Sequence, residues 1–152
     1  MDGDDHDERR PAHAGAGAQA QEKGRREPVT LLTTLGIELE TVGPDLVVAT
    51  MPVTPAHHQP HGILHGGASV ALAETVASIG ASAALARADQ RVVGLEINAN
   101  HLRVVTSGTV TATATPVHKG RSTQVWAAEI RDDAGRLVCV SRCTLAVLAA
   151  HG

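Results

Sequence analysis

The chain has 152 residues, a length that suits one domain with a substantial hydrophobic core rather than two. Its net charge is -3 and only 1% of its residues are aromatic, with no Phe and no Tyr, which argues against nucleic-acid binding by charge or by base stacking. The two cysteines, Cys139 and Cys143, would lie about 13 Å apart on one strand, too far to form a disulfide, so we expect reduced core thiols and a cytoplasmic protein.

Residues 1–28 differ in composition from the rest of the chain. They are charged and then rich in Ala and Gly, with almost no large apolar side chain to offset the entropy lost on ordering. The segment has no apolar region of the kind that secretory signals carry, and its acidic start is unlike a transit peptide. We therefore expect a disordered tail over 1–28 and one folded domain over 29–152.

The folded domain is predicted to begin with a short helix and two strands. The helix is expected over 29–36 and should end at its final glycine. Alternating apolar residues predict strands at 37–42 and 46–53, joined by a Gly-Pro-Asp turn. The segment 54–64 is rich in His, Pro and Gly and is expected to be a loop.

A long apolar helix is expected from Gly66 to Leu85 or Arg87. Glu74 is the only formally charged residue in the segment 62–86, and the small and aliphatic residues around it indicate a helix that is buried on nearly all sides. A carboxylate in such a place loses hydration and must be paired, protonated or functional. The helix is long enough for a membrane span, but the central Glu disfavours one, so we expect no membrane association.

Four strand candidates follow the helix, and their apolar residues alternate as in a sheet with one exposed face. They cover residues 92–105, 108–118, 122–132 and 137–148, with a hairpin turn at 132–135. One buried helix followed by strands that are joined as hairpins predicts an α+β fold, in which a curved antiparallel sheet wraps around one long central helix.

Three sequence blocks within this order of elements resemble those of the hotdog-fold acyl-CoA thioesterases. They are Q-P-H-G-I-L-H-G-G-A-S-V-A-L-A-E-T at 59–75, V-V-G-L-E-I-N-A-N-H at 92–101 and H-K-G-R-S-T-Q-V-W at 118–126. The blocks are most similar to the PaaI-like branch, which holds the enterobactin proofreading and the 1,4-dihydroxy-2-naphthoyl-CoA thioesterases. The resemblance extends over roughly residues 31–148. It implies hydrolysis of an acyl-CoA thioester, favours an aromatic or hydroxyaromatic acyl group, and requires no cofactor beyond the coenzyme A of the substrate.

The resemblance also implies catalytic roles for particular residues. The N–H of Gly66 would polarise the thioester carbonyl, which suits an N–H at the positive end of a helix. Glu74 would act as a nucleophile or as a general base toward water. Gln59 would orient the substrate or the lytic water, and His65 would lie near the thioester. Ser78 would share the helix face of Glu74, because it lies four residues further along.

Other residues are implied in substrate binding. His101 would contact the acyl group, with Arg103 beside it. A basic turn would contact the phosphates of coenzyme A, unless it is only a solvated loop; it consists of His118, Lys119, Gly120, Arg121 and Ser122. Trp126 is expected in the core or at an interface rather than in the substrate pocket.

No metal site is expected, although four histidines lie close together in the sequence. His57, His58, His61 and His65 are separated by a proline and a glycine that would break any helix able to align them. No Cys or Asp completes a zinc ligand set beside them.

The helix geometry bears on assembly. Gly66 and Glu74 would lie about 12 Å apart along one helix, so one chain cannot bring both to a single carbonyl. The resemblance accordingly implies a site between two protomers of a homodimer, which pairs into a homotetramer. Two other functions stay open: a non-catalytic protein that binds acyl-CoA or an acyl carrier, and a hotdog hydratase or dehydratase. The acyl group itself also stays open.

Overall fold

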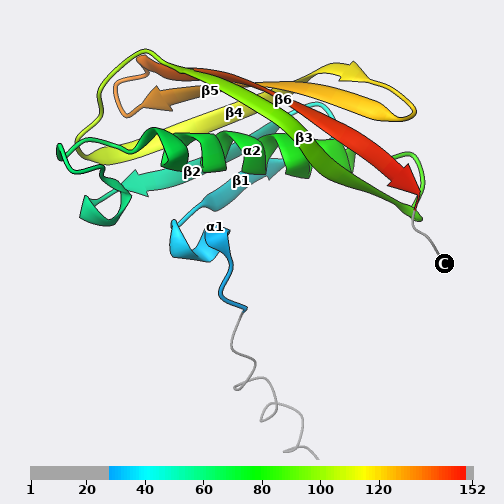
Figure 1. Cartoon of the computed structure of the whole chain (residues 1–152), viewed down its shortest axis with the longest axis horizontal. Helices are drawn as coiled ribbons and strands as arrows, with labels where there is room; N and C mark the ends of the chain where they lie inside the picture. Colours follow the sequence, from blue (N-terminus) through cyan, green and yellow to red (C-terminus); the bar gives the residue numbers. More distant parts are fainter. Residues whose placement is uncertain (1–27, 150–152) are drawn as a thin grey trace, which may run out of the picture.

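The computed structural model describes residues 28–149, so the predicted tail lies outside the described residues except for Pro28. The elements in chain order are α1 (Leu31–Thr34), β1 (Glu38–Val42), β2 (Val47–Val53), the 3-10 helix η1 (Pro55–His57), α2 (Gly66–Ala83), β3 (Gln90–His101), β4 (Gly108–Lys119), β5 (Thr123–Asp132) and β6 (Leu137–Ala149). Six strands form one sheet in the order β1-β2-β4-β5-β6-β3, with every neighbouring pair antiparallel. The sheet curves around α2, which confirms the predicted hotdog fold (Figure 1).

The short helix α1 is fixed at both ends by local chemistry. Thr30 caps its N-terminus, where the Thr30 hydroxyl accepts the N–H of Thr33 and the Thr33 hydroxyl accepts the N–H of Thr30. Gly36 follows the helix with φ 60, a left-handed conformation that favours glycine. The predicted helix end at Gly36 is thus confirmed to within two residues.

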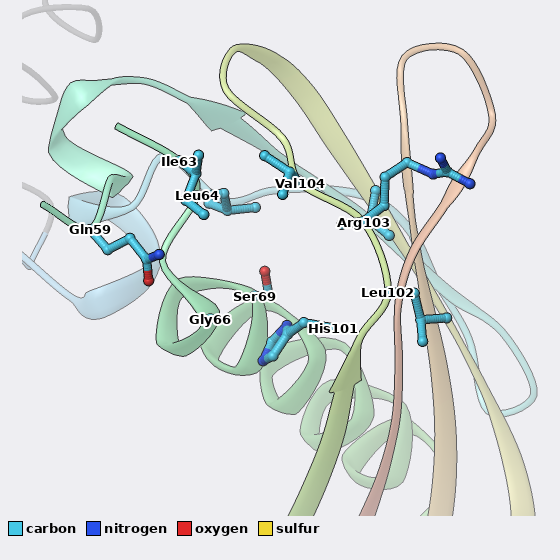
Figure 2. A pocket seen from close by; sticks show the side chains of 10 residues that line it. Gln59, Ile63, Leu64, Gly66, Ser69, His101, Leu102, Arg103 and Val104 are labelled. Atoms are coloured by element: carbon cyan, nitrogen blue, oxygen red, sulfur yellow. The ribbon is translucent and has the colours of Figure 1, made fainter. Parts of the chain in front are cut away.

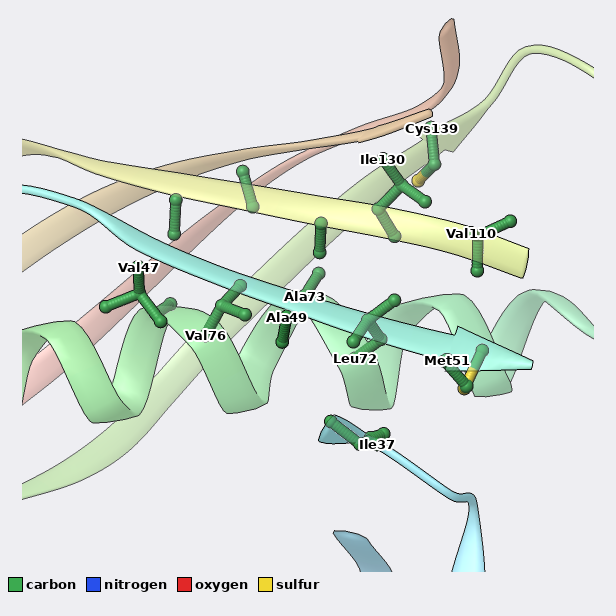
Figure 3. Packing of buried hydrophobic residues seen from close by; sticks show 14 of the residues in the cluster. Ile37, Val47, Ala49, Met51, Leu72, Ala73, Val76, Val110, Ile130 and Cys139 are labelled. Atoms are coloured by element: carbon green, nitrogen blue, oxygen red, sulfur yellow. The ribbon is translucent and has the colours of Figure 1, made fainter. Parts of the chain in front are cut away.

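The core lies between α2 and the concave face of the sheet (Figure 3). The helix buries a stripe of mostly small residues against the sheet, namely Ser69, Leu72, Ala73, Val76, Ala77, Gly80 and Ala81. The opposing positions on β2 and β4 are also small, for example Ala49, Ala112 and Ala114. Because the facing side chains are small, the helix can lie close to the strands.

Trp126 is the largest side chain of this core and is fully buried. Its indole N–H donates to Gln124 Oε1 at 2.9 Å, and Gln124 Nε2 donates to the carbonyl of Ala81 at 3.2 Å. The ring occupies the space beside Gly80, where a Cβ would lie 2.5 Å from two of its atoms. The prediction that Trp126 belongs to the core is confirmed, and its position explains why a glycine stands inside the helix.

Three sequence predictions need correction. The helix α2 ends at Ala83, two residues before the nearer of its predicted ends. The strand β3 ends at His101 instead of at residue 105, because the chain leaves the sheet there and Val105 accepts the N–H of Leu64 from the loop before α2. The helix is also buried on one face only; its other face, which carries Glu74, is half-buried.

Cys139 and Cys143 both lie buried on β6 and are free thiols, as predicted. Within residues 28–149 there is no helix with both the length and the hydropathy needed to cross a bilayer.

Candidate active site

The N-terminus of α2 leaves one backbone donor free. His65 is the N-cap residue, and its Nδ1 accepts the N–H of Gly67 at 2.8 Å. The carbonyl of His65 accepts the N–H groups of Ala68 at 3.0 Å and of Ser69 at 3.3 Å. Among residues 28–149, no acceptor is found for the N–H of Gly66. The positive end of α2 therefore offers a ligand one N–H that no residue of 28–149 uses.

A pocket of about 300 Å³ opens beside this N–H. It brings together four of the predicted site residues, namely Gln59, Gly66, His101 and Arg103 (Figure 2). The ring of His101 packs against Gly66, where a Cβ would lie 2.8 Å from His101 Nε2. Figure 2 shows the Arg103 side chain extending away from the pocket. Ser69, which is 2% exposed, also lines the pocket and was missed by the sequence analysis, because an Ala-Ser pair in an apolar helix carries no distinctive signal.

Glu74 and Ser78 lie on a different face of α2, in a second pocket of about 490 Å³. The walls of that pocket are otherwise mostly aliphatic and include Leu31 and Leu32 of α1. Among the described residues, the carboxylate of Glu74 accepts no hydrogen bond and forms no ion pair. One chain therefore separates the residues around Gly66 from those around Glu74, as the spacing along the helix predicts.

The negative charge of Glu74 affects the pKa of the Cys143 thiol on β6. Burial, followed by the negative charges of Glu74 and Glu96, raises the pKa of Cys143 to about 11. The Cys143 thiol is therefore protonated at neutral pH and is a poor nucleophile.

The predicted basic turn lies away from both pockets, since none of its residues lines either one, and its first two residues, His118 and Lys119, belong to the end of β4. Its N–H at Gly120 donates to Thr123 O at 2.9 Å. Lys119 Nζ bonds to Asp45 Oδ1 at 2.6 Å and to the carbonyl of Pro44 at 3.3 Å, which ties the turn to the hairpin between β1 and β2. Arg121 is the cation of this turn that stays free among residues 28–149.

One histidine of the histidine-rich loop before α2, His57, has a structural role that the sequence did not reveal. His57 is buried, bonds to the Thr54 hydroxyl at 2.9 Å and bonds through Nε2 to the carbonyl of Leu35 at 3.0 Å. It thereby holds the end of α1 against the loop. In the part of the chain from 28 to 149, no group of three or more His, Cys, Asp or Glu side chains is placed to hold a metal ion.

Comparison with known proteins agrees with the fold and the motifs. Residues 61–139 match the Thioesterase superfamily. The chain is 52% identical over 117 residues to a 1,4-dihydroxy-2-naphthoyl-CoA hydrolase of Listeria monocytogenes, which covers 77% of this chain and 94% of the relative. It is 50% identical over 119 residues to the proofreading thioesterase EntH of Cronobacter turicensis, and the match covers 78% of this chain and 86% of the relative.

A solved structure extends the match to three dimensions. The crystal structure of a thioesterase from Haemophilus influenzae superposes with a TM-score of 0.76 at 52% identity and covers 80% of this chain and 84% of that one. The resemblance read from the three sequence blocks is confirmed. The chain belongs to the thioesterase superfamily and is a hotdog-fold thioesterase.

Proposed function

We propose that the chain hydrolyses an acyl-CoA thioester to the free acid and coenzyme A, in a site that two protomers share. The proposal rests above all on α2, on which neither the N–H of Gly66 nor the carboxylate of Glu74 has a partner among residues 28–149, and the two lie on separate faces. The relative from Listeria is named for an aryl-CoA substrate, which favours an aromatic or hydroxyaromatic acyl group.

The two groups suit the two needs of thioester hydrolysis. The carbonyl oxygen of the thioester would accept the N–H of Gly66, and the positive end of α2 would stabilise the negative charge that grows on this oxygen. The carboxylate of Glu74 would attack the carbonyl carbon and expel the CoA thiolate, leaving an anhydride that water cleaves. Alternatively, the carboxylate would take a proton from the attacking water. Either route consumes one water and yields one acid and one thiol.

The remaining site residues have supporting roles in this proposal. Gln59, beside Gly66, would orient the substrate or the water, and His101 would contact the acyl group. The hydroxyl of Ser78 would bond to the substrate or the water next to Glu74. His65 would act through its cap, which uses the N–H of Gly67 and leaves that of Gly66 free.

A second copy of the chain would complete the site. The strand β3 stands at one end of the sheet and pairs only with β6 among the described residues. It exposes Val93 at 45% and Leu95 at 63%, and a free strand edge with apolar side chains favours pairing with another strand. Pairing of two β3 strands would extend the sheet and bring Glu74 of one protomer toward Gly66 of its partner. The homotetramer, the cytoplasmic location and the contact between the basic turn and CoA phosphates stay predictions.

The first test is the activity of purified protein on benzoyl-CoA, 4-hydroxybenzoyl-CoA, 1,4-dihydroxy-2-naphthoyl-CoA and hexanoyl-CoA, followed as thiol release. We expect turnover, fastest with an aryl thioester. Glu74→Gln should lower kcat at least about a hundredfold, because the variant loses the nucleophile or base but keeps the shape of the side chain.

The matched control is Glu40→Gln, which removes an exposed carboxylate of β1 that lines neither pocket and should leave kcat within about twofold of wild type. Binding of the thioesters without hydrolysis would contradict the proposal and favour a non-catalytic binding protein. Near-normal turnover by Glu74→Gln would show that another group carries the reaction.

A further inference from the structure

We propose that Gly94 is a positioning residue, whose missing side chain leaves the space that holds the Glu74 carboxylate in its reactive orientation. The inference rests on the proposed role of Glu74. It adds the requirement that β3 have no side chain at position 94. This strand ends at His101 and pairs only with β6 among the described residues.

Gly94 lies close to Glu74, and the nearest atom is one carboxylate oxygen of that side chain. A Cβ built on Gly94 would lie 2.8 Å from Glu74 Oε1 and 3.9 Å from Glu74 Cδ. Gly94 is paired with Leu145 of β6, which is fully buried on the inner face of the sheet. Since directly opposed residues of an antiparallel pair share a face, the missing side chain of Gly94 would point toward α2.

The backbone of Gly94 does not itself require glycine. Four described glycines have a positive φ, namely Gly36, Gly62, Gly108 and Gly135, and Gly94 is not among them. The register of β3 against β6 shifts between Gly94 and Glu96, so that Ile97 also faces inward, opposite Cys143. The inner face of β3 therefore has branched side chains on either side of a gap, and the Glu74 carboxylate occupies that gap.

Packing against Gly94 matters because hydrogen bonds do not fix the carboxylate. Within residues 28–149, Glu74 has no hydrogen-bond or ion-pair partner that would hold one rotamer. A methyl group at position 94 would collide with the far end of a flexible side chain, which can move at low cost to folding. Gly80 is a useful contrast, because a methyl group there would collide with the buried ring of Trp126.

The variant Gly94→Ala should therefore separate catalysis from stability. Restoring an ordinary contact of 3.4 Å from 2.8 Å requires the carboxylate to move by about 0.6 Å or to change rotamer. Misplacement of a reacting group by about 1 Å can cost on the order of a hundredfold in rate. We expect kcat for the best thioester of the panel to fall between about tenfold and a hundredfold, with KM changed less than about threefold.

Three further measurements make the result specific. The melting temperature and the oligomeric state of Gly94→Ala should match the wild type, and a crystal structure of the variant should show the Glu74 carboxylate displaced. Gly43→Ala serves as the matched control, because a Cβ there would make only an ordinary contact of 3.4 Å with Leu46 O. It should leave kcat, KM and melting unchanged.

The proposal is wrong if Gly94→Ala keeps the wild-type kcat. It is also wrong if the variant loses activity because its melting temperature falls or its assembly fails, since Gly94 would then be needed for folding or assembly rather than for placing Glu74. A carboxylate that stays in place in the crystal structure overturns it as well. This last readout holds even if the wild type hydrolyses none of the thioesters, an outcome that would overturn the proposed function instead.

Discussion

Cys143 makes the folded state sensitive to alkaline pH. Its pKa rises to about 11 in the folded protein, from an ordinary value near 9, through burial and the charges of Glu74 and Glu96. Between these two pH values the folded chain keeps the thiol proton and the unfolded chain loses it. The contribution of Cys143 to the free energy of unfolding is therefore fully present below about pH 9 and is lost as the pH rises toward 11.

We predict that the free energy of unfolding in urea falls between pH 8.5 and pH 10.5, and that it falls less steeply in Cys143→Ala. The variant should be less stable than wild type at pH 8 because it leaves a small cavity, so the comparison concerns the slope with pH. The chain has no tyrosine, so phenol ionisation does not add to this slope. Equal slopes for variant and wild type would contradict the raised pKa of Cys143.

The residues of the site differ in how visible they are in the sequence. Glu74 is a lone charge in an apolar helix, and Gly66 belongs to a recognisable block, so both could be singled out. Gly94 also lies in a matching block, but neither its proposed role nor that of His57 could be read there, because both depend on contacts with Glu74 and with the Leu35 carbonyl. Such contacts depend on strand register and loop path, which local sequence does not specify.

At the scale of elements, the packing of α2 on β5 depends on one glycine. Alanine is favoured over glycine inside a helix by about 1 kcal/mol. At Gly80 that gain is opposed by a Cβ that would lie 2.5 Å from the ring of Trp126, which is held by its hydrogen bond to Gln124. The ring has no room to retreat because it is fully buried.

We predict that Gly80→Ala destabilises the protein by about 1–3 kcal/mol in urea unfolding at fixed protein concentration, since overpacking outweighs helix propensity. Ser82→Ala, an exposed change two residues further along α2, should stay within about 0.5 kcal/mol of wild type. Replacing Trp126 by Leu should reduce the cost of Gly80→Ala, because the two sites share one contact. If Gly80→Ala were more stable than the wild type, the prediction would be wrong, and the Trp126 ring would have moved to make room for the methyl group.

The order and type of the elements could be predicted because periodicity and turn residues are local signals. The antiparallel sheet around one helix followed from that order. The ends of α2 and β3 could not be predicted as well. Beyond His101 the sequence still alternates like a strand, yet the Val105 carbonyl bonds to Leu64 in a loop about forty residues earlier. Tertiary hydrogen bonds decide such boundaries.

At the scale of the whole molecule, we propose that the two pockets of one chain are halves of one shared site. One has the free N–H of Gly66 with Gln59 and His101, and the other has Glu74 with Ser78. The free edge of β3 offers a surface on which a second copy could join them. If this is correct, activity should require assembly, and dilution below the dimer dissociation constant should reduce specific activity.

The most direct test of the shared site is to mix two inactive variants. Glu74→Gln keeps an intact Gly66, while Gly66→Pro keeps an intact Glu74 and removes the N–H at a helix position that tolerates proline. Gly66→Ala, which keeps the N–H but still crowds His101, controls for the added carbon atoms. Subunit exchange is verified beforehand by native mass spectrometry of the mixture.

A shared site predicts that each mixed dimer regains one of its two sites. With equal amounts and random exchange, half of the dimers are mixed, so thioesterase activity should return to about a quarter of the wild-type level. Mixed dimers that form and remain as inactive as their parents would contradict the shared site and show that Glu74 works within its own protomer.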